Sequence, residues 1–510
     1  MAKITRFLVG FRSSATVPKE AEGAIDAFIA EQQGLHEIRR LKGGQRVLEM
    51  AVEQAEKLTR QRPDLCIEED LELKLLSSIP GLLPKVSQEI TGKLRVRTVD
   101  EESNAGVDSV SVYCLGHEIA YKGVTDKNGN VDIDIHEPDL RHIIAAPRSG
   151  YWSKVCAPPE ISEKSECEIR LQKLPPVGDY GWGFQLLGVD QCREKFTGKG
   201  IKIGLIDSGA STHENLSFAG GFNALLGKDA EWTRDEDGHG THCAGILAAQ
   251  GKGLKGMAPG SEIYPVKVYP GGRLSDFVEA VNWCIDNYMD LICIGVGSPF
   301  HTQQMEVVLL EAFDRGITCV AAAGNDYGPV TFPAAYDHVL AVTAMGKARE
   351  FPADSVHGWA MGELSGYEDL FFAAFSNFGQ QIDFCAPGVA IQSTVPNGRG
   401  AWDGTSMSCA FVAGLAALVL EAYPEIRTGD AYQPHYLRRI LSDTAIDLGL
   451  PRQMQGAGLI SAIDALSEAF IRRAQEETDL ISYKRSLKAA LEEAKRKVED
   501  LERELAGLNP

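Results

Sequence analysis

Gly404-Thr405-Ser406-Met407-Ser408-Cys409-Ala410-Phe411-Val412-Ala413-Gly414 is the stretch from which the rest of the chain can be interpreted. A tight Gly-Thr-Ser turn leads into a run of Ala, Val, Leu and Gly, which predicts a buried helix. The turn places the Ser406 hydroxyl at the helix N-terminus, where unpaired N–H groups and the helix dipole favour negative charge. Ser406 therefore suits a nucleophile whose attack creates an oxyanion, although serine also caps many core helices.

Two upstream stretches carry an aspartate and a histidine. Asp207 closes the apolar run at residues 201–206, which predicts a buried strand. A carboxylate at the carboxyl end of a parallel strand lies where α/β active sites usually form, although an aspartate can also simply begin a turn. Glycines flank His239 at the start of an Ala-rich helix, so backbone and substrate can approach its ring. His239 and His242 could instead bind a metal, but no partner ligand at suitable spacing supports that.

Asn325 ends a run of small residues, Val320-Ala321-Ala322-Ala323-Gly324. Small side chains leave room for a substrate, and an asparagine amide can donate a hydrogen bond to a developing oxyanion. The same run could equally be an ordinary exit from a strand. Each of these signals is weak alone, but their order along the chain is informative.

In the order Asp207, His239, Asn325 and Ser406, these stretches resemble the subtilisin family of serine proteases, and subtilisin itself has its triad in the order Asp, His, Ser. The resemblance extends through further segments at residues 256–259, 264–268, 290–297, 385–389 and 456–460. It implies an α/β fold, with a parallel sheet flanked by helices, over a catalytic domain at residues 175–470.

The resemblance also implies a role for each site residue. Ser406 would be the nucleophile, His239 the general base and then acid, and Asp207 the group that orients the imidazole. The Asn325 amide and the Ser406 backbone N–H would form the oxyanion hole. An extended peptide substrate would pair as an added strand, and a small-residue pocket would hold the side chain before the scissile bond. The residues implied for pairing are Leu274, Ser275, Gly295, Val296 and Gly297, and those implied for the pocket are Ala322, Ala323 and Gly324.

Residues 1–76 have the element order β-α-β-β-α-β, which predicts a small ferredoxin-like domain. Its opening strand at residues 7–11 and closing strand at residues 64–70 resemble those of subtilisin-type propeptides. In that family the propeptide assists folding and lays its C-terminal tail through the active-site cleft. We therefore expect this domain to act as an intramolecular inhibitor, with residues 71–76 in the cleft and self-cleavage near Leu76 and Ser77.

Residues 77–174 predict a linker followed by a small β-sandwich, because short alternating runs are separated by turn residues. Asp126, Asn128, Asn130 and Glu137 resemble a calcium loop in spacing, but Val131 stands where such a loop needs glycine. A hairpin at Asn128-Gly129 is favoured, and no metal is assigned. We expect the sandwich to bind or position something, although a passive spacer is the alternative.

Two further segments stand apart from the resemblance. Residues 346–372 interrupt it, and they could be a lid, a docking loop or a surface excursion. Residues 471–510 predict an amphipathic coiled-coil helix that could dimerise, dock on a partner protein or fold back on its own domain. Its apolar stripe comprises Leu480, Leu487, Leu491, Ala494, Val498, Leu501, Leu505 and Leu508.

Composition limits the remaining possibilities. The 510 residues carry a net charge of −20 with a pI of about 5.1, which argues against a nucleic-acid or anionic-membrane surface. No apolar run approaches the roughly 20 residues of a membrane span, and the N-terminus lacks the pattern of a secretory signal. Eleven cysteines without CxxC pairs indicate a reducing compartment, the cytoplasm. The sequence thus predicts an intracellular serine endopeptidase made as an autoinhibited precursor and working without cofactor or metal; the alternative is a catalytically silent or partner-gated binding protein with the same fold.

Overall fold

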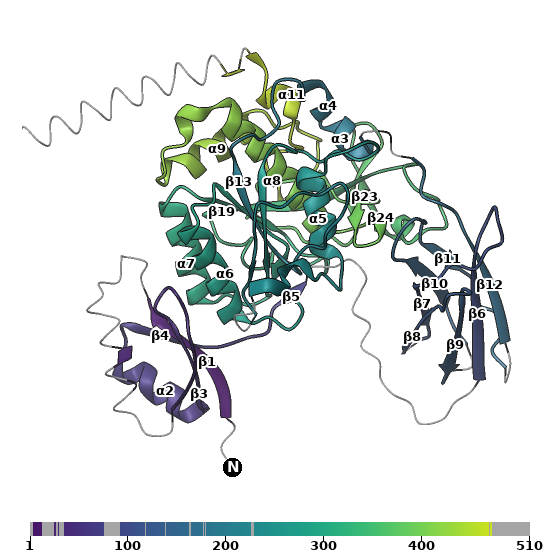
Figure 1. The fold of residues 1–510 in the computed structure, drawn as a ribbon, viewed down its shortest axis with the longest axis horizontal. Coiled ribbons are helices and arrows are strands. Elements are labelled where there is room, and N and C mark those ends of the chain that lie inside the picture. The colour runs from purple at the N-terminus through teal and green to yellow at the C-terminus, as the bar shows by residue number, and fades with distance from the viewer. Residues whose placement is uncertain are drawn as a thin grey trace, which may run out of the picture.

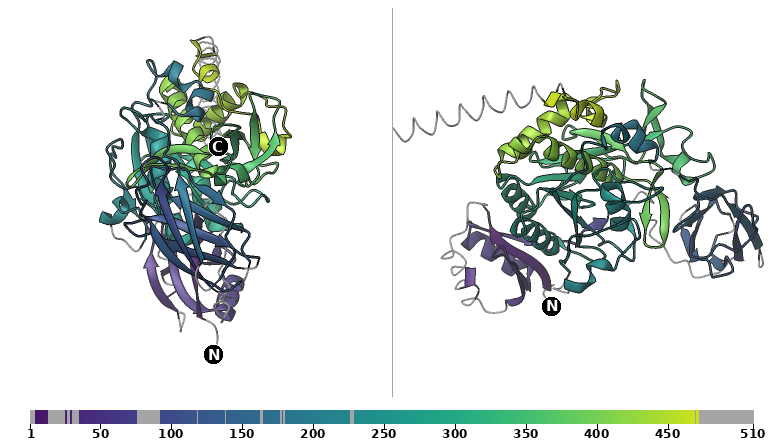
Figure 2. Two further views of the ribbon diagram at one scale, coloured as in Figure 1. Left: turned by 90° about the vertical axis from the view of Figure 1, so that its right-hand side faces the viewer. Right: turned by 45° about the horizontal axis from the view of Figure 1, so that its top comes forward.

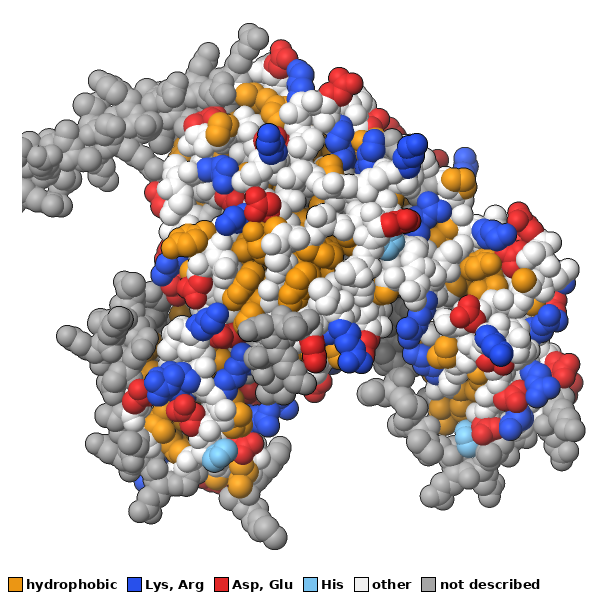
Figure 3. All heavy atoms as spheres, in the orientation of Figure 1, with side chains coloured by type: hydrophobic (Ala, Val, Ile, Leu, Met, Phe, Trp, Pro, Cys, Tyr) orange, Lys and Arg blue, Asp and Glu red, His pale blue; other side chains and the backbone are white. Residues whose placement is uncertain are grey.

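The computed structural model describes residues 4–12, 25–26, 29, 35–75, 92–117, 119–137, 139–162, 165–176, 178, 180–225, 229–468 and 470–471. The chain forms a small N-terminal domain, a β-sandwich and a larger central unit (Figure 1). The small domain and the sandwich lie on opposite sides of the central unit, as the other orientations also show (Figure 2). On the face seen in Figure 3, acidic and basic side chains are interspersed over the described parts of all three units.

A nine-stranded sheet runs through the central unit in the order β14-β15-β13-β16-β18-β19-β21-β20, with β22 also paired to β19. The strands from β14 to β19, together with β22, are parallel, and most of their residues are buried on both faces. β20 lies inside the segment 346–372, β21 begins in it and ends one residue beyond, and the two add an antiparallel edge, so the predicted parallel sheet is a mixed one. The strands are β13 (Lys202–Asp207), β14 (Phe222–Asn223), β15 (Glu262–Lys267), β16 (Leu291–Ile294), β18 (Thr318–Ala322), β19 (Val339–Lys347), β20 (Met361–Leu364), β21 (Leu370–Ala373) and β22 (Phe384–Pro387).

Helices cover both faces of this sheet (Figure 1). Because side chains alternate along a strand, Leu291 and Cys293 of β16 pack in the core that contains α5 and α8, whereas Ile292 and Ile294 pack in the core that contains α6 and α7. The helices are α3 (Trp182–Leu186), α4 (Val189–Cys192), α5 (His239–Ala248), α6 (Leu274–Asp286), α7 (Gln303–Asp314), α8 (Thr405–Ala422), α9 (Tyr432–Asp443), α10 (Arg452–Gln455) and α11 (Ala462–Ala465), with 3-10 turns η1 (Asp229–Thr233), η2 (Val356–Ala360) and η3 (Pro424–Ile426).

Helix α8 corrects one reading of the sequence. Its 18 residues are long and apolar enough to cross a membrane by composition, with a mean hydropathy of 1.7. However, 94% of this helix is buried within the protein, where it fills the core behind the sheet. An apolar run of that length is therefore present, and here it belongs to the core.

The N-terminal domain is a four-stranded antiparallel sheet in the order β2-β3-β1-β4. Helix α2 buries Ala55 and Leu58 against this sheet, and its opposite side is charged. A short strand, β5, follows β4 and leaves the domain to pair with the central unit. The elements are β1 (Ile4–Phe11), β2 (His36–Arg40), β3 (Arg46–Ala51), α2 (Val52–Gln61), β4 (Leu65–Glu69) and β5 (Lys74–Leu75).

The sandwich consists of two sheets, β11-β10-β7-β8 and β12-β6-β9, that share one apolar core. The turn at Asn128-Gly129 is present, and the Asp126 carboxylate accepts from the N–H groups of Asn128 and Asn130 at 2.9 Å. It is not the predicted hairpin, because β8 and β9 pair with different sheets. The strands are β6 (Gly92–Asp100), β7 (Val110–Leu115), β8 (Ala120–Val124), β9 (Asn130–Ile135), β10 (His142–Pro147), β11 (Lys154–Cys156) and β12 (Ser165–Leu171).

Several predictions fall largely outside the described residues, among them the first helix of the β-α-β-β-α-β order and the linker that opens residues 77–174. The coiled-coil helix expected at residues 471–510 is outside them except for Ile471, and so is the self-cleavage position at Leu76 and Ser77.

Candidate active site

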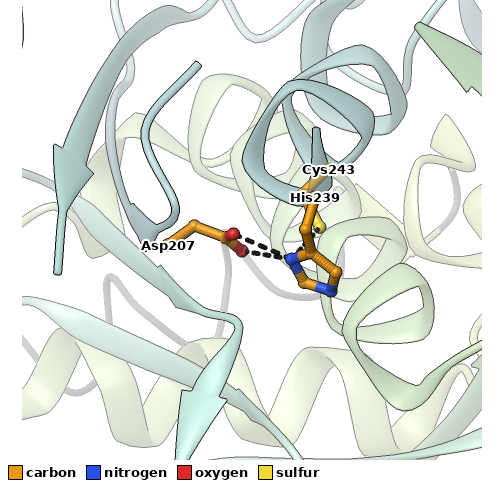
Figure 4. Close-up of side chains that lie close together, drawn as sticks. All are labelled: Asp207, His239 and Cys243. Carbon is orange, nitrogen blue, oxygen red and sulfur yellow. Dashed lines mark hydrogen bonds and ion pairs between the residues drawn. The ribbon is translucent and has the colours of Figure 1, made fainter. Parts of the chain in front are cut away.

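Asp207 and His239 form a buried pair at the carboxyl edge of the sheet (Figure 4). Asp207 is the last residue of β13, and His239 is the first residue of α5. The His239 Nδ1 atom lies 2.8 and 3.0 Å from the two carboxylate oxygens, and both side chains are almost fully buried. Burial disfavours charge on the imidazole, but the Asp207 carboxylate outweighs it, and the pKa of His239 lies well above the ordinary 6.5.

Asp235, which the sequence reasoning missed, fixes the start of α5. Its carboxylate accepts from the N–H groups of Gly238 and Thr241 at 2.8 Å and from the Thr241 hydroxyl at 2.6 Å. It also accepts from the Ser208 hydroxyl at 2.8 Å. Burial raises the pKa of Asp235, and these donors oppose that effect. Asp235 thereby links the loop after β13 to the first turn of α5, the two places that carry Asp207 and His239.

Ser406 is the second residue of α8 and is 1% exposed. Its hydroxyl donates to the Gly295 carbonyl at 3.5 Å. Gly295 also lies directly against the Asp207–His239 pair, since a Cβ there would collide with Asp207 Oδ2 and lie 3.2 Å from His239 Cε1. His239 Nε2 is buried and has no hydrogen-bond partner in the described structure. Gly295 therefore lies next to both the serine hydroxyl and the imidazole.

Asn325 lies at the same helix N-terminus as Ser406. Its Oδ1 atom accepts from the Thr405 N–H at 3.0 Å and from the Thr405 hydroxyl at 2.9 Å. These contacts fix the oxygen side of the amide, and the N–H donors of the group are on its nitrogen. The structure thus brings Asp207, His239, Asn325 and Ser406 to one edge of the sheet, at the ends of β13 and β18 and the starts of α5 and α8.

The small residues before Asn325 are buried in the protein. Ala322 is 1% exposed, and Ala323 pairs through its N–H with the Val342 carbonyl. The Gly324 N–H donates to the Thr405 hydroxyl at 3.2 Å. Gly324 has a φ of 112°, and a Cβ would collide with the Asn377 amide, which explains the glycine. These three residues are thus buried and fixed by hydrogen bonds and packing directly before Asn325.

The two segments expected to pair with a peptide hold the chain's own residues 71–75. On one side, the Leu73 N–H donates to the Gly272 carbonyl at 2.8 Å, and the Leu274 N–H donates to the Leu71 carbonyl at 2.8 Å. On the other side, β5 pairs antiparallel with β17 (Val296–Gly297), with Leu75 opposite Val296 and Lys74 opposite Gly297. The Leu73 side chain is 3% exposed and packs in the central unit's core with Leu274 and Val296.

The N-terminal domain also places a carboxylate at the start of each neighbouring helix. Asp70 accepts from the Ser275 N–H at 2.8 Å and from its hydroxyl at 2.9 Å, in the first turn of α6. Glu68 accepts from the N–H groups of Gln303 and Gln304 at 2.7 and 2.9 Å, in the first turn of α7. Because a helix N-terminus favours negative charge, both contacts stabilise the docked domain.

Sequence comparison assigns the family. The subtilase family profile matches residues 198–459, a little over half of the chain. The chain belongs to the subtilase family. It is 32% identical over 310 residues to an alkaline protease of Alkalihalobacillus alcalophilus, covering 59% of this chain and 72% of that protein. It is 33% identical over 289 residues to subtilisin Savinase of Lederbergia lenta, covering 55% of this chain and 96% of that protein. The protein is a subtilisin-like serine endopeptidase, and a protease of this kind acts on polypeptides.

This subtilase also has one set of side chains close enough to hold a metal ion among its described residues. Ligand atoms of Asp207, His239 and Cys243 lie within 4.8 Å of one another, and Cys243 Sγ is 3.9 Å from His239 Nδ1 (Figure 4). The sequence reasoning missed Cys243 as a third donor, although it follows His239 by one helical turn. Burial raises the pKa of the Cys243 thiol to about 12, which disfavours the thiolate that a metal requires.

His242 is separate from that group. Its Nε2 atom faces the Ile391 carbonyl at 2.9 Å, and its ring stacks on Trp402 with centroids 4.9 Å apart. Burial lowers the pKa of His242 to about 3, so the ring is neutral at ordinary pH. The two histidines therefore do not share the metal-binding face that their spacing left open.

Proposed function

We propose that Asp207, His239 and Ser406 form the catalytic triad of this endopeptidase. The Ser406 Oγ atom attacks the scissile carbonyl carbon while His239 Nε2 takes the hydroxyl proton. His239 then gives that proton to the leaving amine, which leaves an acyl-enzyme, and a water molecule repeats the sequence to release the acid. Asp207 holds Nδ1 and stabilises the imidazolium, and the Asn325 amide with the Ser406 N–H binds the oxyanion.

One observation carries this proposal: the imidazole is bound to a buried carboxylate through Nδ1, while Nε2 is unpaired and adjacent to the backbone that holds the Ser406 hydroxyl. The proposal requires the hydroxyl to turn from the Gly295 carbonyl toward Nε2. Catalytic hydrogen bonds are often long in enzymes without substrate and tighten in the reacting complex.

We also propose that the N-terminal domain inhibits its own protease. Residues 71–75 use the same backbone groups that a peptide substrate would use as an added strand, so substrate and tail exclude each other. Self-cleavage near Leu76 and Ser77 would follow from this direction of the tail, because Leu75, the last described residue before that position, is paired with β17. The filled cleft equally favours the related reading of a protease that stays latent until a partner displaces the tail.

A reducing compartment, the cytoplasm, is proposed on the cysteines. All eleven are free, and most are buried in apolar surroundings. Cys293 and Cys409, whose sulfur atoms are 3.6 Å apart in the core, remain thiols. A chain that keeps so many buried thiols is suited to a compartment that maintains them.

Labelling of the full chain with a small fluorophosphonate tests the triad. We expect covalent labelling of the wild type and none in Ser406→Ala or His239→Ala, because the reagent needs an activated serine. Ser408→Ala is the matched control: Ser408 lies on the same helix, but its hydroxyl is bonded to the Ala386 carbonyl at 3.0 Å. Labelling that persists in Ser406→Ala, or an inert wild type after long incubation, would contradict the proposal.

A further inference from the structure

The turn that presents Ser406 is fastened residue by residue. Thr405 is bonded to Asn325, and the Gly404 N–H donates to the Gly388 carbonyl at 2.8 Å. Asp403, the next residue back, accepts from the Ala390 N–H at 2.6 Å through its Oδ1 atom. Three consecutive residues before the nucleophile thus have a defined anchor each.

The anchor of Asp403 stabilises an unfavourable backbone conformation. Ala390 has a φ of 55°, in the left-handed region that residues with a side chain rarely adopt. Such a conformation persists where surrounding contacts hold it, and here the Ala390 N–H is bonded to a largely buried carboxylate. Asp403 therefore holds the backbone at Ala390, in the segment that follows β22. This segment lies beside the turn that presents Ser406, since its Gly388 carbonyl accepts from the Gly404 N–H.

A second group holds Asp403 from the segment 346–372. His357 in η2 donates from Nδ1 to the same Asp403 oxygen at 2.6 Å, and its side chain is 2% exposed. Its Nε2 atom is buried without a partner in the described structure. Burying the Nε2 atom without a hydrogen-bond partner is unfavourable. Because the ring is buried nevertheless, we infer that the hydrogen bond from Nδ1 to Asp403 stabilises this arrangement.

The β-sandwich completes the arrangement. Trp152, between β10 and β11, is 4% exposed and packs edge-on against the His357 ring, with centroids 5.4 Å apart. Trp152 belongs to an apolar cluster that also contains Phe371 of β21 and Val389 of the central unit. Around it, the Val155 N–H donates to the Asp354 carbonyl at 2.6 Å, and Lys154 pairs with the Asp354 carboxylate at 3.0 Å.

We propose that His357 and Asp403 are positioning residues for Ser406, and that the sandwich holds them in place through Trp152. The segment 346–372 is then a docking platform that connects the sandwich to the nucleophile turn. This inference rests on the proposed role of Ser406. It gives the sandwich a role in the reaction without contact with the substrate.

The test measures the two constants of fluorophosphonate labelling, kinact and KI, in the full chain. The tail at residues 71–75 lies on Gly272, Leu274 and β17, not on the varied residues, so its effect on access is common to all variants. His357→Phe keeps a ring against Trp152 but removes the donor to Asp403. We expect kinact to fall about tenfold and KI to change less than about twofold, because small displacements of a nucleophile are costly.

His357→Asn makes the opposite change, since its amide can donate from near the Nδ1 position while the ring is lost. We expect it to retain more kinact than His357→Phe despite a lower Tm. A merely structural role predicts that kinact follows Tm, and that ranking would overturn the proposal, as would an unchanged kinact in His357→Phe. If His357→Phe does not fold, Asp403→Asn, which keeps an acceptor oxygen, is compared with Asp403→Ala by the same criterion.

The part played by the sandwich has its own pair of variants. Trp152→Ala removes the support of the His357 ring, and Lys154→Ala removes only the partly exposed ion pair to Asp354. We expect kinact to fall several-fold in Trp152→Ala and to stay within about twofold in Lys154→Ala, because exposed ion pairs contribute little. Equal kinact in the two variants would overturn the link to the sandwich. An inert wild type would instead count against the triad itself, so the two failures are distinguishable.

Discussion

His239 is buried and has a carboxylate partner, Asp207. Burial lowers the pKa of His239, whereas the carboxylate raises it. The partner prevails, and the pKa of His239 lies well above 6.5. A general base must be neutral, so reaction at Ser406 should rise with pH, with a midpoint above 6.5. We expect kinact for fluorophosphonate labelling to show this rise when it is measured across the neutral and alkaline range.

Asp207→Asn supplies the control for this pH dependence. Without the carboxylate, the charged imidazole loses its main support, so the midpoint should move to lower pH while the maximal kinact falls. Using kinact rather than the observed rate excludes effects of pH on docking of the tail. A wild-type midpoint at or below 6.5, or one that is the same in Asp207→Asn, would refute this account of His239.

Individual residues differ in how far their sequence context reveals them. The motifs around Asp207, His239, Asn325 and Ser406 lie at strand ends and helix starts, which periodicity can locate. The part played by Asp235 could not be predicted, because it depends on contacts with Ser208, Gly238 and Thr241 that only the fold creates. Spacing alone cannot show which aspartate in a charged loop is turned inward.

At the level of elements, β5 pairs with β17, where we propose that a substrate binds, and we expect this docking to depend on the caps that precede β5. Asp70→Ala would remove two hydrogen bonds to Ser275 and leave a buried N–H at the start of α6 without an acceptor. Hydrogen bonds to a charged group contribute about 1.5–3 kcal/mol, so docking should weaken by about tenfold or more. We expect the labelling rate of Ser406 at low reagent concentration to rise by a similar factor.

Asp64→Ala is the matched control for that substitution. Asp64 lies in the same domain, but its carboxylate pairs with Arg62, at 2.7–2.9 Å, within the domain itself. Its loss should leave access to Ser406 unchanged. If Asp64→Ala raises labelling as much as Asp70→Ala, the effect comes from loss of domain stability, and the capping contact is not responsible.

Elements were predictable where the signal was local. The described elements β1, β2, β3, α2 and β4 of the N-terminal domain follow from alternation, helical spacing and turn residues, and the buried strand before Asp207 follows from its apolar run. The pairing of β8 and β9 with different sheets does not, because a tight Asn-Gly turn has the same local signal in a hairpin and in a crossing between sheets. The segment 346–372 was equally ambiguous, since its buried His357 contacts Trp152 far away along the chain.

At the scale of the whole molecule, two added domains contact the central unit in different ways. The N-terminal domain caps α6 and α7 and pairs β5 with β17, and we propose that a substrate replaces the second of these contacts. The sandwich joins β21 and the segment before α8 in an apolar cluster that leaves the cleft untouched. We therefore expect the first domain to be released more readily than the second.

The covalent connection through residues 76–91 determines whether docking of the N-terminal domain depends on protein concentration. While that connection is intact, the local concentration of the tail does not change when the protein is diluted. Once it is cut, docking becomes a reaction between two molecules. A recognition sequence for an unrelated specific protease, introduced into residues 77–91, allows the two states to be compared in one preparation.

We expect the labelled fraction of the uncut chain to be independent of protein concentration. In the cut chain it should rise over about a thousandfold dilution, as the domain dissociates below its Kd. Asp70→Ala should move this rise to higher protein concentration, because the same bonds to Ser275 hold the domain in both states. A cut chain whose labelling is insensitive to dilution even with Asp70→Ala would mean that the tail does not control access to Ser406, since release of the domain would then leave the nucleophile no more accessible than before.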